Sequence, residues 1–239
     1  ASYEAGFRTP TLSELYDTDI AKKNDRLTIG NLDLKPEKNN YFSLSAEYVH
    51  ERFSVSVNAF YNNIRDMIDY NTIATGDKAM EQYGHKEVRQ RDNIAEAKVH
   101  GINVSANAYL GAGFNLSGGY THLNTQDVEL EQPIDKSIKN AYNINAQWAH
   151  SWKIYRLNIN LNGRINSKRF SKSYGYAPEY QLWDLNTRHS FNLKSVIIEP
   201  GCGMENLFDY MDDRPYNSNY ATLTPGRSFY ISLSLKFKS

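Results

Sequence analysis

Apolar and polar side chains alternate along most of this chain, and a two-residue period of this kind predicts β-strands. In the last stretch, Ile231 and Leu233 flank Ser232, so the apolar pair would share one face of a strand and the serine the other. The same period predicts about ten strands. They lie near residues 1–8, 40–49, 53–70, 89–109, 114–123, 140–149, 154–166, 180–193, 197–209 and 226–237. Several exceed the ~9–11 residues that span a membrane, so we expect them to project beyond it.

The connections between these stretches alternate in length. The short ones lie near residues 50–52, 111–113, 151–153 and 194–196, and the long ones near 9–39, 71–88, 124–139, 167–179 and 210–224. Brief periplasmic turns and long extracellular loops are the layout of an outer-membrane barrel. The sequence therefore predicts an all-β fold, an antiparallel up-and-down transmembrane β-barrel.

The composition fits a barrel whose strands face water on one side. Mean hydropathy is −0.65, and the chain contains no run of the ~18 apolar residues that a transmembrane helix needs. Asn160 and Asn162 stand inside a strand-like stretch, where asparagine is normally depleted. A polar lumen explains them better than the dry core of a soluble antiparallel sandwich, whose strands also tend to be shorter, about 5–6 residues. Aromatic residues near the short turns fit an interfacial girdle: Tyr48, Tyr109, Trp148, Trp152, Tyr155 and Phe237.

Charge and motifs argue against several classes of function. Lys+Arg and Asp+Glu both count 27, so the net charge is zero and we expect no nucleic-acid partner. The single cysteine, Cys202, allows no intrachain disulfide. No G-x-S-x-G or H-E-x-x-H motif occurs, and the adjacent His189 and Ser190 would point to opposite faces of a strand. We therefore expect no enzyme. A passive porin-like barrel stays open as an alternative.

Short motifs follow one another along the chain. They are FRTP at 7–10 with ELY at 14–16, GNLDLKPE at 30–37, YNNIRDMI at 61–68, NIAEAKVHGI at 93–102, NLFD at 206–209 and PGR at 225–227. By their order and spacing, the chain resembles the C-terminal part of a TonB-dependent outer-membrane receptor over nearly its whole length. Most of these residues also have an architectural interpretation, since Pro10 and Pro36 restrict the backbone at strand–loop borders.

The resemblance implies a barrel of about 22 strands around a plug. Residues 1–239 would form one C-terminal segment of that barrel, with the plug and the N-terminal strands outside it. The opening residues ASYEAGF already read as part of a strand, so we expect an upstream part. The implied place is the outer membrane of a Gram-negative bacterium. The implied partners are outer-membrane lipid, a small-molecule ligand, the TonB complex acting through the plug, and optionally a surface lipoprotein.

The same resemblance suggests haem or another iron chelate as cargo rather than as a resident cofactor, with cobalamin as the alternative. Haem receptors of this type carry a histidine between two sequence boxes, which correspond here to FRTP at 7–10 with ELY at 14–16 (the first box) and GNLDLKPE at 30–37 (the second box). Residues 11–30 contain no histidine, and Tyr16 is the phenol there. Tyr83 and His85 are the best substitute for an iron-ligating pair. The DMIDY segment at 66–70 resembles cobalamin receptors. The candidate ligand-binding residues in the loops are Arg8, Tyr16, Tyr83, His85, Arg89, Tyr174, Tyr176, Tyr216 and Tyr220.

Overall fold

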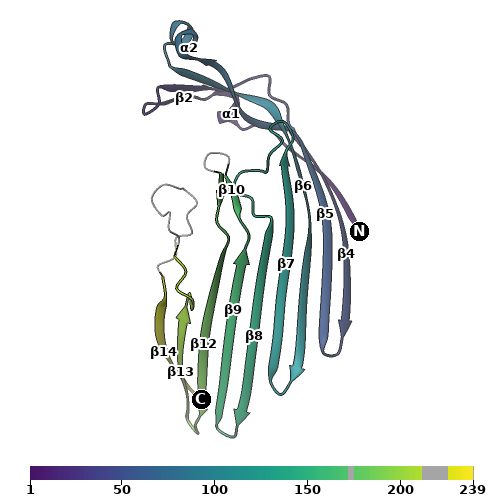
Figure 1. Ribbon diagram of the computed structural model, residues 1–239, viewed down its shortest axis with the longest axis vertical. Coiled ribbons are helices and arrows are strands. Elements are labelled where there is room, and N and C mark those ends of the chain that lie inside the picture. The colour runs from purple at the N-terminus through teal and green to yellow at the C-terminus, as the bar shows by residue number, and fades with distance from the viewer. Residues whose placement is uncertain (172–174, 212–225, 239) are drawn as a thin grey trace. The chain divides into compact units, whose positions relative to one another are not determined.

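The computed structural model describes residues 1–171, 175–211 and 226–238. Its main sheet follows a meander in which neighbours in sequence are neighbours in the sheet (Figure 1). The strands, in order, are β1 (Ser2–Arg8), β4 (Glu37–His50), β5 (Phe53–Thr75), β6 (Glu87–Gly111), β7 (Phe114–Asp127), β8 (Asn140–Trp152), β9 (Tyr155–Asn166), β12 (Tyr180–Asn192), β13 (Val196–Glu205) and β14 (Ser228–Phe237). All the predicted strands are confirmed, with ends shifted by a few residues.

The chain folds as two compact units that share the long strands. The first comprises residues 1–44, 60–100 and 125–134, and the second comprises residues 45–59, 101–124 and 135–239. The short turns belong to the second unit. In one of them, Ala112 and Gly113 have φ angles of 50° and 87°. A β-carbon on Gly113 would collide with the Ala149 carbonyl, so this tight turn needs glycine for space as well as for its backbone conformation.

The polar face of the second unit is a set of cross-strand hydrogen bonds between short side chains. Asn145 donates to Asn160 and Asn162, with N···O distances of 2.6 and 2.7 Å, and Ser56 and Ser105 lie 2.7 Å apart. The opposite face is apolar, and Leu116, Ala146, Ile159, Leu161 and Leu185 line a shallow groove there. The alternation in sequence therefore does separate a polar face from an apolar one.

Aromatic rings gather near the short turns of the second unit. Trp152 lies 5.5 Å from Tyr155 and 4.3 Å from His150, measured between ring centroids. The Tyr155 hydroxyl lies 2.7 Å from Nδ1 of His189. The structure thus places these rings where an interfacial girdle was predicted, and two strand histidines join them.

The long connections contain elements that alternation did not predict. They are α1 (Leu12–Tyr16), β2 (Thr18–Ala21), β3 (Arg26–Ile29), α2 (Gly76–Tyr83), β10 (Arg169–Ser171) and β11 (Gly175–Ala177). In the first unit, β3 pairs in parallel with the start of β6, and Leu27, Ala79 and Val88 form a small core there. Among the described residues, no helix has both the length and the apolar character to cross a membrane.

Candidate functional site

Helix α1 begins at a capping box, in which a threonine and a glutamate satisfy each other's backbone N–H groups. The Thr11 hydroxyl accepts from the Glu14 backbone N–H at 3.3 Å, and Glu14 Oε2 accepts from the Thr11 N–H at 2.8 Å. The sequence TLSE therefore starts a helix directly after β1. This local signal holds Glu14 at a fixed position over the end of that strand.

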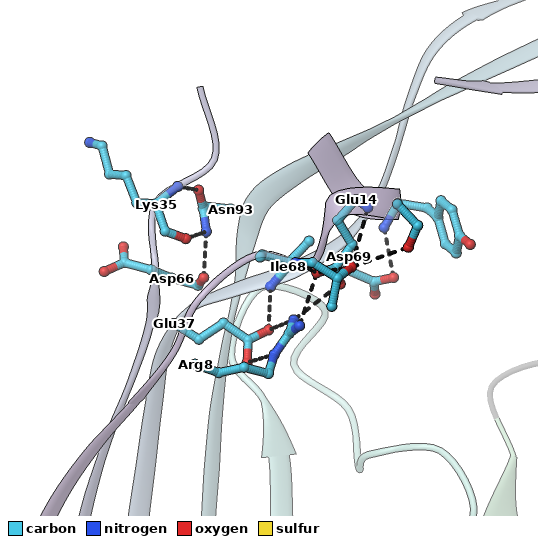
Figure 2. A network of polar contacts seen from close by, with 11 residues as sticks. Arg8, Glu14, Lys35, Glu37, Asp66, Ile68, Asp69 and Asn93 are labelled. Carbon is cyan, nitrogen blue, oxygen red and sulfur yellow. Dashed lines mark hydrogen bonds and ion pairs between the residues drawn. The ribbon is translucent and has the colours of Figure 1, made fainter. Parts of the chain in front are cut away.

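Arg8, the last residue of β1, joins three elements through its guanidinium group (Figure 2). Its Nη1 donates to Glu14 of α1 at 2.9 Å, and its Nε and Nη2 donate to Glu37 of β4 at 2.7 and 2.6 Å. Glu37 also accepts from the backbone N–H of Ile68 in β5 at 2.9 Å. The network therefore fixes α1 to three neighbouring strands.

The charged groups of this network pair mainly with one another. The Glu14 side chain is 11% exposed and the Glu37 side chain 14%, whereas Arg8 is 43% exposed. The hydrogen bond from Arg8 holds the pKa of Glu14 down at about 2 and also lowers the pKa of Glu37. The two carboxylates raise the pKa of Arg8 in turn. Arg8, predicted as a ligand-binding residue, thus pairs with two carboxylates and joins α1 to β4.

The two sequence boxes dock backbone to backbone. Gly30 N–H donates to the Asp17 carbonyl at 2.8 Å, and Asn31 N–H donates to the Glu14 carbonyl at 3.0 Å. A β-carbon on Gly30 would lie 2.5 Å from the Leu15 carbonyl oxygen, so only glycine allows this approach. The predicted architectural role of the boxes is consistent with these contacts.

Asn93 of β6 joins the second box to the wall (Figure 2). Its Oδ1 accepts from the Lys35 N–H at 2.7 Å, while Nδ2 donates to the carbonyls of Lys35 and Asp66 at 3.0 and 2.6 Å. Asp66 has a φ of 56°, which marks a local irregularity in β5. One amide side chain therefore ties the second box to both β5 and β6.

The Tyr83–His85 cluster, predicted as a ligand site, makes contacts within the loops. Tyr83 packs against the core of Leu27, Ala79 and Val88. Nδ1 of His85 lies 2.9 Å from a carboxylate oxygen of Asp25, and this contact lowers the pKa of Asp25. Both residues therefore hold the connection at 9–39 against α2.

The remaining predicted residues that the structure describes have different surroundings. Nε of Arg89 donates to Glu87 at 2.6 Å, so this cation is also paired. Tyr16 is 66% exposed on α1. Tyr176 is also exposed, stands edge-on to Phe170 with centroids 5.3 Å apart, and belongs to the other unit. Three further candidates lie outside the described residues: Tyr174, Tyr216 and Tyr220.

Tyr70 of β5 and Arg91 of β6 form a pair that the sequence did not indicate. The guanidinium carbon of Arg91 lies 3.7 Å from the centroid of the Tyr70 ring, and its Nη2 donates to the Tyr70 hydroxyl at 2.6 Å. Arg89 and Arg91 look alike in the sequence. Only the structure shows that Glu87 neutralises the first and that an aromatic ring supports the second.

A known protein family shares this architecture. Residues 1–207 match the family model described as TonB dependent receptor-like, beta-barrel. The chain belongs to the TonB-dependent receptor family. The family consists of transport receptors of the Gram-negative outer membrane, not of enzymes, which places this chain in that membrane and confirms the predicted barrel-wall fold.

Solved receptors have the same wall. A mutant of the ferric enterobactin receptor PfeA from Pseudomonas aeruginosa superposes with a TM-score of 0.73 at 20% identity, over 99% of this chain and 37% of that one. The siderophore receptor PirA from Acinetobacter baumannii gives 0.70 at 16% identity, over 99% and 38%. The copper transporter OprC gives 0.69 at 14%, over 99% and 36%. At these identities the likeness shows the fold alone, and this chain spans less than two fifths of each receptor.

Proposed function

We propose that this TonB-dependent receptor chain is the C-terminal part of the barrel of an active transporter for an iron chelate. In this proposal the extracellular loops bind the chelate, and TonB acting through a plug supplies the energy. The observation that carries it is that the connections at 9–39 and 71–88 form one organised surface, held by the Arg8 network, by Asn93 and by β3 on β6. Two of the solved receptors with this wall are named for ferric enterobactin and for siderophores.

Among iron chelates, a siderophore complex is the first candidate, because two of the solved receptors with this wall are named for such ligands. Haem would need an imidazole or phenol of the protein to ligate its iron. Tyr83 is packed, whereas the contact with Asp25 occupies Nδ1 of His85 and leaves Nε2 for a metal. Tyr16 is exposed and keeps haem as the second candidate. The DMIDY segment at 66–70, which resembles cobalamin receptors, makes contacts within the loop-end networks. The Ile68 N–H donates to Glu37, and the Asp66 carbonyl accepts from Asn93. Among the described residues, no contact supports cobalamin specifically, and a surface lipoprotein partner stays a prediction.

Iron-limited growth tests this function. A strain without its own ferric-chelate receptors should regain growth when it carries the full-length receptor and is supplied with a panel of ferric siderophores. The same strain without TonB should not regain growth. Growth that is independent of TonB would indicate a passive porin, and growth on haemin alone would move the protein to the haem receptors. Uptake of labelled cobalamin, measured in parallel, would support the remaining alternative.

A further inference from the structure

The pair formed by Tyr70 and Arg91 lies near the loop ends of two unusually long strands. β5 has 23 residues and β6 has 25, whereas ~9–11 residues suffice to cross the membrane. Both side chains therefore stand on regular strand backbone beyond the membrane-spanning part. Tyr70 is 42% exposed and Arg91 is half-buried, so the pair can be reached from the solvent.

Arg91 differs from its neighbouring cations in its partners. Arg8 and Arg89 each bond a carboxylate, and Lys38 lies 3.6 Å from Asp66. Within the described part of the chain, Arg91 forms no ion pair, and its side chain makes one hydrogen bond, to the Tyr70 hydroxyl. An arginine carries five N–H donors. Among the described residues, most of the donors of Arg91 therefore have no partner, and no carboxylate pairs with its charge.

The position of this guanidinium is nevertheless well defined. The Tyr70 ring and its hydroxyl both contact the guanidinium and hold it in place. The backbone carbonyl of Arg91 accepts from Nδ2 of Asn31 at 2.9 Å, which ties this point of β6 to the second box. A cation that is oriented before binding loses less conformational entropy when the ligand arrives.

Exposed apolar and aromatic residues belong to the chain segments that Asn31 ties to Arg91. Asn31, which bonds Arg91, is followed by the exposed Leu32 and preceded by Gly30. Gly30 in turn packs against the backbone of Tyr16, a residue that is 66% exposed. Leu32 and Tyr16 offer apolar area that could meet the flat faces of an aromatic ligand held at Arg91.

We propose that Tyr70 and Arg91 form a binding site for an anionic, aromatic iron chelate of the ferric catecholate class. This inference rests on the proposed function and specifies the substrate class of the receptor. The planar guanidinium donates to the catecholate oxygens in a bidentate manner, and its charge complements the negative charge of the complex. A neutral ferric trihydroxamate offers neither the aromatic faces nor the charge, so the site discriminates against it.

Binding to the full-length receptor in detergent tests the site, with a synthetic ferric tris-catecholate and a neutral ferric trihydroxamate as probes. Arg91→Gln should weaken tris-catecholate binding about ten- to hundredfold, the effect of losing charge-assisted hydrogen bonds. Arg91→Lys keeps the charge but not the planar fork and should give an intermediate loss. Arg89→Gln, a matched control two positions away on the same strand, should change the affinity less than about threefold.

The following results would contradict the proposed site. Unchanged tris-catecholate affinity in Arg91→Gln, or an equal loss in Arg89→Gln, shows that Arg91 does not contact the ligand. If Arg91→Gln does not fold, Arg91→Lys and Tyr70→Ala decide, and unchanged affinity in both overturns the proposal. A wild-type receptor that binds no tris-catecholate but imports iron from another chelate leaves the proposed function intact and removes this site. Import from no chelate contradicts both.

Discussion

Neutralising Glu14 tests how strongly charge holds α1 to the wall. Glu14→Gln keeps the shape and the reciprocal cap with Thr11 but removes the charge facing Arg8. A pKa lowered from 4.5 to about 2 corresponds to ~3 kcal/mol at 1.36 kcal/mol for each pKa unit. Since Arg8 is 43% exposed, solvent screening reduces the expected loss to about 1–2 kcal/mol.

The pH dependence has a definite sign. A carboxyl whose pKa is lower in the folded than in the unfolded state stabilises the fold above its unfolded value, and this stabilisation disappears as pH falls through the folded value. For Glu14 the window runs from 4.5 down to about 2. The difference between the parent receptor and Glu14→Gln should therefore be full at pH 7, roughly halved by pH 3 and nearly absent at pH 2.

Hydrogen exchange of the full-length receptor in detergent measures this local stability. The informative amides are those of Leu15 and Asp17, which donate to the carbonyls of Thr11 and Ser13. After correction for intrinsic exchange, their opening should increase about five- to thirtyfold in Glu14→Gln at pH 7, the equivalent of 1–2 kcal/mol.

A matched control is Lys38→Met. Its ion pair with Asp66 is long, at 3.6 Å, and both side chains are more exposed than Glu14, so the expected loss is below about 0.5 kcal/mol. No change of exchange in Glu14→Gln at pH 7 would refute the reasoning. A difference that persists unchanged at pH 2 would also refute it, because it could not come from the charge.

Two further predictions concern packing. Ile159→Arg should cost about 2–4 kcal/mol if the residue lies near the membrane midplane, whereas Asn160→Arg on the polar face should cost little. Equal losses in a folding titration into lipid vesicles would contradict the assignment of the two faces. Gly30→Ala should loosen α1, because its β-carbon would lie 2.5 Å from the Leu15 carbonyl oxygen, while Gly6→Ala meets nothing within 4 Å. Proteolysis at α1 compares the two variants, and equal cleavage would contradict the close approach.

The sequence predicted the wall better than the loops. Strand positions followed from alternation, and short turns followed from their length and from residues such as Gly113. The elements within the long connections were missed because they are short and depend on distant partners. β3 has four residues and forms because β6 offers an edge for parallel pairing. A strand of that length has no period strong enough to be detected in the sequence.

At the candidate site, the sequence likewise indicated residue types but not their contacts. Residue types suggested Arg8, His85 and Arg89 as ligand-binding groups, but each is paired with a carboxylate in the structure. Tyr16 was chosen for its place between the boxes, and its exposure keeps it available. Arg91 was overlooked because the sequence does not show which of two similar arginines has a carboxylate beside it.

The sequence by itself determined the all-β wall, its two faces and its family. Strand geometry imposes a two-residue period on every residue, so that information is local and can be read along the chain. The tertiary structure alone decided which charges meet. Arg8 and Glu37 are 29 positions apart, and Asn31 and Arg91 are 60 apart. The Coulombic and hydrogen-bond energies of such pairs depend on spatial distance, which the path of the loops sets and the local pattern does not encode.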